Sequence, residues 1–321
     1  MLKKFITVTA LAFSLLILLC SCGADVSEKD GISIVTTVFP QYDFASRITE
    51  GTGTQVTMLI PAGSEAHSYD PTPSDMIKVS ECDLFIWVGG ESEAWAEKII
   101  KSASLEDDKL LSLMDTVPLL ETADGHGDGD DSEHEHDGEH DGEHEYDEHV
   151  WTSPKNAIII VGAITEKLCE VDPDSAEIYR KNSEDYLKKL SELDADFEVL
   201  AAKASGETLI FGDRFPFLYL TEEYGFEYTS PFRGCSSHTE ASMAEIAAVI
   251  EKARDIGAKT VFAVDFSNGK LAKTIAEEVG GTVEKLYSCH VASKDDIEKG
   301  NGYLELMRMN LESIEKAFAT D

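Results

Sequence analysis

The sequence predicts an α/β fold of two small (β/α) lobes with parallel-type sheets, joined by one long rigid helix. Strand-like and helix-like segments alternate in both halves of the 321-residue chain, which is typical of parallel sheets. Between the halves, apolar side chains recur at helical spacing through residues 173–204. At about 1.5 Å per residue this helix is about 45 Å long. Because that is too long to cover one small sheet, we expect it to join two lobes.

Residues 1–21 have the pattern of a lipoprotein signal peptide. Two lysines precede an apolar run that is short for a membrane span and typical of secretion. The following Leu19-Cys20-Ser21-Cys22 resembles a bacterial lipobox, in which a small residue precedes the lipidated cysteine. A plain signal peptide or an N-terminal anchor helix is the alternative. We expect an extracytoplasmic protein, anchored to the cell membrane by acyl chains on Cys22, with residues 22–31 as a polar tether.

Residues 32–172 form the expected first lobe. Runs rich in β-branched and aromatic residues predict strands, and apolar residues at helical spacing predict helices. Ser74 is positioned to cap one of these helices. The predicted strands are 32–38, 56–60 and 83–88, and the predicted helices are 40–49, 74–80, 93–102 and 157–169.

Residues 173–204 and 205–321 complete the expected architecture as linking helix and second lobe. Pro173 suits the first position of the linking helix, after a capping Asp172. Because ligands of such sheets bind beyond the carboxyl ends of the strands, loops that follow strands are the first place to look for a site. In the second lobe the predicted strands are 208–211, 260–264 and 282–286, and the predicted helices are 215–224, 242–256, 269–279 and 303–319.

An acidic, histidine-rich insert interrupts the first lobe at residues 121–148. Residues 125–149 hold six of the nine histidines, without Lys or Arg, and fourteen of the 62 acidic residues lie between Glu121 and Glu148. The remainder of a chain of net charge −35 is therefore only moderately acidic, and the lack of a basic stripe argues against a nucleic-acid partner. We expect the insert to be disordered and to collect metal ions, because imidazole and carboxylate bind divalent metals. A merely solvated acidic loop is the alternative.

His67 and His149 are the first ligand candidates. His67 lies in a loop rich in Gly and Pro after the predicted strand 56–60, and such a loop can position a side chain at little entropic cost. His149 ends the acidic run, directly before an apolar Val-Trp pair. Taken singly, His67 could instead be a loop histidine bound to a backbone carbonyl, and His149 the last residue of the low-complexity run.

The surroundings of these histidines resemble those of a known family. The shared elements are Gly63-x3-His67-x-Tyr69-x-Pro71-Thr72-Pro73-Ser74-Asp75, the His-rich insert and His149-x-Trp151-x2-Pro154. They resemble the zinc/manganese-type (cluster A-I) substrate-binding lipoproteins of ABC importers, in the zinc-uptake branch, over essentially the whole mature chain. The resemblance implies two lobes, one metal in the interlobe cleft with His67 and His149 as first-lobe ligands, and transfer of that metal to a membrane permease.

The second-lobe ligands depart from the family pattern. The third position falls on Arg214, which cannot bind a metal and must point away or pair with a carboxylate such as Asp213. The fourth position falls near Cys289 and His290. We expect His290 first and Cys289 second, since adjacent residues of an extended loop point in opposite directions. Further candidates are Cys235, His238 and Asp265.

Cysteine usage is too sparse for a disulfide-dense scaffold. Cys82 and Cys169 lie in apolar contexts, so we expect them in the core. Cys235 and Cys289 both lie in loops, and a disulfide between them is the alternative to a ligand role. Such a bond would leave His290 as the ligand.

These observations predict a monomeric metal-capture subunit, not an enzyme, that binds Zn²⁺ and delivers it to an ABC permease. Imidazole favours zinc over manganese, which prefers oxygen. No His-Glu-x-x-His element or Ser/His/Asp arrangement in a known context supports an enzyme. A manganese-type, adhesin-like lipoprotein and an extracellular zinc store are the alternatives. Because binding requires neutral imidazoles, we expect zinc affinity to fall below about pH 6.5.

Overall fold

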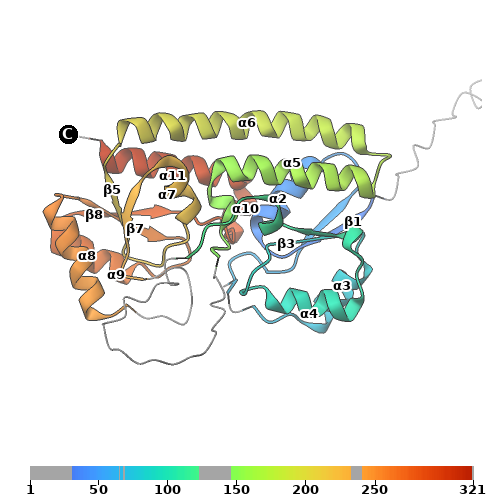
Figure 1. Cartoon of the computed structure of the whole chain (residues 1–321), viewed down its shortest axis with the longest axis horizontal. Coiled ribbons are helices and arrows are strands. Elements are labelled where there is room, and N and C mark those ends of the chain that lie inside the picture. The colour runs from blue at the N-terminus through green and yellow to red at the C-terminus, as the bar shows by residue number, and fades with distance from the viewer. Residues whose placement is uncertain (1–30, 65, 68, 123–145, 233–240, 320–321) are drawn as a thin grey trace, which may run out of the picture.

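Two α/β lobes lie side by side beneath one long helix (Figure 1). The structure is a computed structural model that describes residues 31–64, 66–67, 69–122, 146–232 and 241–319. The predictions for the signal peptide, for Cys22, for Cys235 and His238, and for insert residues 123–145 lie outside this part of the chain. Within the described residues, no helix is both long and apolar enough to cross a membrane.

The first lobe is built on a four-stranded sheet in the order β2-β1-β3-β4, and every pair in it is parallel. The strands are β1 (Ser33–Thr36), β2 (Gln55–Met58), β3 (Leu84–Trp87) and β4 (Leu110–Ser112). The two central strands, β1 and β3, are almost fully buried, as their β-branched and aromatic residues predict. The alternation of strands and helices therefore predicted the sheet type correctly.

Helices cover this sheet close to their predicted bounds. They are α2 (Phe39–Ile48), α3 (Pro73–Glu81), α4 (Ala94–Ala103) and α5 (Pro154–Val171), with short 3-10 turns at Asp107–Lys109, Met114–Thr116 and Val150–Thr152. The predicted cap at Ser74 is wrong. Thr72 caps α3 instead. Its hydroxyl accepts the backbone N–H of Asp75, and the carboxylate of Asp75 accepts the backbone N–H of Thr72.

The linking helix is α6 (Ala176–Lys203), which extends over both lobes in Figure 1. At about 1.5 Å per residue it is about 42 Å long. It packs on α2 and α5 of the first lobe and on α7 (Leu218–Tyr224) and α11 (Tyr303–Phe318) of the second. The N-cap of α6 is Ser175 and not Asp172. Pro173 lies in a turn before the helix, where its carbonyl accepts the backbone N–H of Ala176.

The second lobe contains two parallel strand pairs, β5–β6 and β7–β8. A parallel bridge between Phe211 and Phe262 connects them. The strands are β5 (Thr208–Ile210), β6 (Glu227–Thr229), β7 (Thr260–Val264) and β8 (Thr282–Leu286), and the helices are α7 (Leu218–Tyr224), α8 (Met243–Asp255), α9 (Lys270–Val279), α10 (Lys294–Lys299) and α11 (Tyr303–Phe318).

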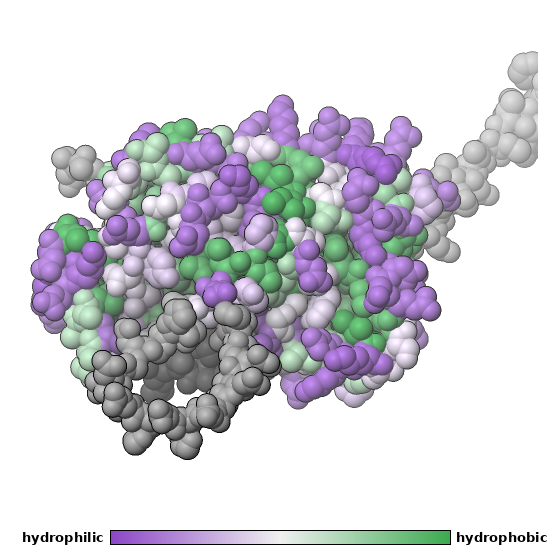
Figure 2. Space-filling view, viewed as in Figure 1, coloured by the Kyte–Doolittle hydropathy of each residue, from purple (hydrophilic) through white to green (hydrophobic). Residues whose placement is uncertain are grey.

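One large apolar cluster extends through both lobes and the helices above them. It includes Trp151 from the first lobe, Phe197 of α6, and Phe211 and Tyr303 from the second. Figure 2 shows hydrophilic residues spread over both lobes, with smaller apolar areas between them. The continuous core thus brings the facing loops of the two lobes close together.

Candidate metal site

His67 lies in the loop that follows β2, and the second lobe supports this loop. The backbone N–H of Gly63 donates to the carbonyl of Ala292 at 3.0 Å. Gly63 has φ +79°, a conformation that favours glycine. After the histidine, the hydroxyl of Tyr69 donates to Asp75 at 2.8 Å. The loop is thus held on both sides of His67.

His149 directly precedes the turn Val150–Thr152 that leads into α5, and its side chain is buried. Asp147 Oδ1 accepts the backbone N–H of His149 at 2.8 Å and lies 3.1 Å from its Nδ1. Since a carboxylate only accepts, this contact fixes the proton on Nδ1 and presents Nε2 to a metal. Tyr219 of α7 donates to the carbonyl of Asp147 at 2.9 Å, so the second lobe also supports this ligand.

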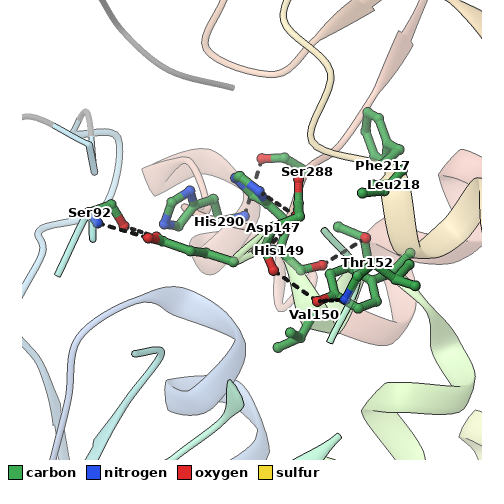
Figure 3. A network of polar contacts seen from close by, with 12 residues as sticks. Ser92, Asp147, His149, Val150, Thr152, Phe217, Leu218, Ser288 and His290 are labelled. Carbon is green, nitrogen blue, oxygen red and sulfur yellow. Dashed lines mark hydrogen bonds and ion pairs between the residues drawn. The ribbon is translucent and has the colours of Figure 1, made fainter. Parts of the chain in front are cut away.

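His290 follows β8 and is held by both lobes. Its carbonyl accepts the backbone N–H of Phe39 at 3.2 Å, and its own N–H donates to the hydroxyl of Ser288 at 3.2 Å. The indole N–H of Trp151 donates to the carbonyl of Ser288 at 2.8 Å. Figure 3 shows His149, His290, Asp147 and Ser288 within one polar network.

Among the described residues, His67, His149 and His290 form a group of side chains that could hold one metal ion. One ligand atom from each lies within 4.8 Å of the others. The ring centroids are 5.6 Å apart for His67 and His149, 4.8 Å for His67 and His290, and 5.3 Å for His149 and His290. Nitrogen ligands of a tetrahedral zinc lie about 3.3 Å apart, given Zn–N bonds of about 2.0 Å. The ligand atoms therefore need to approach one another by at most about 1.5 Å to hold one ion.

The environment of the site keeps the imidazoles of His67 and His290 neutral. Burial lowers the pKa of His67 to about 4; the electrostatic interactions with His149 and Arg214 act in the same direction, and Asp147 opposes them. Burial also holds the pKa of His290 well below its ordinary value, with His67 and His149 acting in the same direction. Neutral imidazole is the form that binds metal. Loss of affinity below pH 6.5, expected from ordinary imidazoles, therefore moves to lower pH for these two ligands.

The structure does not bring Cys289 into this group. Cys289 has φ +57°, and its thiol is not in a disulfide. The thiol packs within the apolar core and donates a weak hydrogen bond to the carbonyl of Tyr287 at 3.8 Å. Burial raises the pKa of the thiol well above its ordinary value, which disfavours the thiolate that a metal needs. Cys235, the predicted disulfide partner, lies outside the described residues.

A cavity of about 510 Å³ contains the three histidines together with Asp213, Arg214 and Asp265. Arg214 lines this cavity, and its guanidinium carbon lies 6.0 Å from the centre of the Phe232 ring. Asp265 lies outside the group of three, and burial raises its pKa to about 6. The sequence prediction missed Asp147 as the partner of His149, because one acid in a run of acids carries no distinguishing signal.

Comparison with known proteins finds relatives that are named for zinc uptake and zinc binding. A family model described as "Zinc-uptake complex component A periplasmic" matches residues 34–317. The high-affinity zinc uptake system protein ZnuA of Bacillus subtilis is 34% identical over 294 residues, which cover 91% of this chain and 89% of that protein. The zinc-binding lipoprotein AdcA of Streptococcus pneumoniae is 28% identical and matches over 98% of this chain, which spans 61% of that protein.

Solved structures show the same fold. The metal-dependent lipoprotein YcdH of Bacillus subtilis superposes with a TM-score of 0.73 at 29% identity, covering 90% of this chain and 100% of that one. The Zn(II)-bound ZnuA-like domain of Streptococcus pneumoniae AdcA gives a TM-score of 0.72 at 26% identity, covering 89% and 98%. The two-lobed arrangement is therefore shared with proteins that bind metal.

Proposed function

The chain belongs to the zinc-uptake complex component A family, and from this premise we propose that His67, His149 and His290 capture Zn²⁺ between the lobes for an ABC importer. Members of this family are substrate-binding proteins of zinc uptake. The convergence of three imidazoles from loops of both lobes, two of them buried, carries the proposal, and burial favours the neutral, metal-binding form of His67 and His290. Imidazole suits zinc better than manganese, and three neutral nitrogens with one open position match the ligand preference of zinc.

The same geometry suits delivery to a partner. His67 and His149 belong to the first lobe and His290 to the second, so a change in the angle between the lobes would separate the ligands. We assign the receiving partner as the permease of the importer, reached by a chain anchored through Cys22. Mass spectrometry of the chain from membranes tests the anchor: diacyl or triacyl mass on an N-terminal Cys22 is expected, and an unmodified N-terminus contradicts it.

Metal analysis tests the site apart from the insert. Glu121 and Tyr146 form an antiparallel bridge, so residues 125–145 can be replaced by a short Gly linker without parting the ends. This variant should retain one tightly bound zinc per chain and prefer zinc to manganese. His67→Ala should abolish that zinc, whereas His126, inside the deleted segment, is dispensable. Loss of most zinc on deletion, with no effect of His67→Ala, would instead identify a zinc store.

A further inference from the structure

The ring of Trp151 contacts two of the three imidazoles. Its centroid lies 5.6 Å from that of His149, edge to face, and 5.1 Å from that of His290, both within the range of favourable aromatic contacts. The side chain is fully buried. Because an indole nitrogen only donates hydrogen bonds, Trp151 cannot itself be a metal ligand. One ring from the first lobe therefore touches a candidate ligand of each lobe.

The indole N–H of Trp151 also reaches the backbone that carries His290. It donates to the carbonyl of Ser288 at 2.8 Å, and both residues are buried. The next residue, Cys289, has φ +57°, a conformation that is costly for residues other than glycine and persists only where surrounding contacts hold it. The hydrogen bond from Trp151 is such a contact, one residue before the strained position and two before His290.

Trp151 is in turn bound to the second lobe and, through it, to the linking helix. Its carbonyl accepts the hydroxyl of Tyr303, the first residue of α11, at 2.6 Å. The backbone N–H of Tyr303 donates to Asp43 of α2 at 3.0 Å. The hydroxyl of Tyr186 in α6 donates to the same carboxylate oxygen at 3.2 Å. The position of Trp151 therefore depends on how the two lobes and the linking helix pack together.

We propose that Trp151 is a positioning residue for zinc capture, whose indole N–H holds the backbone at Ser288 so that the imidazole of His290 faces the two first-lobe ligands. Without this donor a buried carbonyl would lack its hydrogen bond, which is unfavourable. The backbone of Ser288 would turn toward another donor, and His290 would move with it. The proposal rests on the zinc-binding function above and identifies the contact between the lobes on which the third ligand depends.

Trp151→Phe tests this role, because Phe keeps an aromatic ring and lacks the N–H. The full chain is titrated with zinc in mild detergent, against enough chelator that His67→Ala takes up no zinc, so that zinc bound by the insert is not counted. Zinc affinity should fall about tenfold in Trp151→Phe, a typical loss for a residue that orients a ligand. Trp95→Phe is the matched control and should keep the affinity of the unmodified chain, because the buried N–H of Trp95 has no acceptor among the described residues.

Reaction of the metal-free chain with diethylpyrocarbonate, mapped by mass spectrometry, shows whether Trp151 acts through His290. The imidazole of His290 should react faster in Trp151→Phe than in the unmodified chain, and at the unmodified rate in Trp95→Phe. Unchanged zinc affinity in Trp151→Phe would overturn the proposal, as would a loss of affinity without faster reaction of His290.

A second replacement keeps the packing of Trp151. Benzothienylalanine at position 151 has sulfur in place of the N–H and nearly the shape of tryptophan. It should give the same affinity loss and the same faster reaction of His290, and it decides the outcome if Trp151→Phe does not fold. If the unmodified chain and His67→Ala take up the same amount of zinc, the proposed function fails instead, while the reaction rates still test the position of His290.

Discussion

Replacing Asp147 with Asn should weaken zinc binding without removing any ligand. Asp147 Oδ1 receives both the backbone N–H and the Nδ1 of His149, at 2.8 and 3.1 Å. Asn keeps an acceptor oxygen but loses the negative charge that orients the imidazole and raises its basicity. Loss of such a partner typically lowers metal affinity by about 10–100-fold, which corresponds to about 1.4–2.7 kcal/mol.

Competition with a fluorescent zinc chelator at pH 7.5 measures this change, using the variant without residues 125–145 so that only the cleft is titrated. Asp194→Asn is the matched control, because Asp194 also accepts a hydrogen bond from a tyrosine, at 2.7 Å from Tyr224, but lies away from the cleft. Its affinity should equal that of the parent. An Asp147→Asn affinity within about twofold of the parent would refute the view that this carboxylate orients His149.

Two further predictions concern the histidines of the site, and a third concerns the core contact of α6. Protonation of His67 and His290 should lower zinc affinity by less than about tenfold between pH 7.5 and 5.5, because burial lowers the pKa of both; two ordinary imidazoles would lower it by about 100-fold, and chelator competition at both pH values measures the loss. Metal-free protein should lose stability as the pH falls from about 6.5 to 4, since the unfolded chain binds a proton at His67 before the folded one does; an urea midpoint equal at pH 7 and 5 would contradict this. Phe197→Ala in α6 should cost about 3–5 kcal/mol of unfolding free energy, measured by urea denaturation, with Val199→Ala on the exposed face as a control expected to change little.

Local sequence signals predicted most of the fold. The strands at 260–264 and 282–286 match their predicted bounds, because short β-branched runs there end in turns. The strands Leu110–Ser112 and Glu227–Thr229 were not predicted. Each has only three residues, so its pairing depends on a neighbouring strand rather than on its own pattern.

The candidate ligands were partly predictable from their positions in the sequence. His67, His149 and His290 follow strands or end a distinctive run, and resemblance to a family added weight to them. The order of His290 before Cys289 was predicted on the assumption that both residues lie in an extended loop. Cys289 instead has φ +57°, and its thiol lies in the core. The role of Asp147 depends on its contact with His149, which composition does not reveal, because Asp147 is one of fourteen acidic residues in the same run.

X-ray absorption at the zinc edge tests the three-histidine site most directly. With one equivalent of zinc on the variant without residues 125–145, the spectrum should show three imidazole nitrogens and one oxygen at about 2.0–2.1 Å, and no sulfur. His67→Ala should lose this signal, whereas Cys289→Ser should keep it. A sulfur scatterer at about 2.3 Å, or an unchanged spectrum in His67→Ala, would contradict a site formed by His67, His149 and His290.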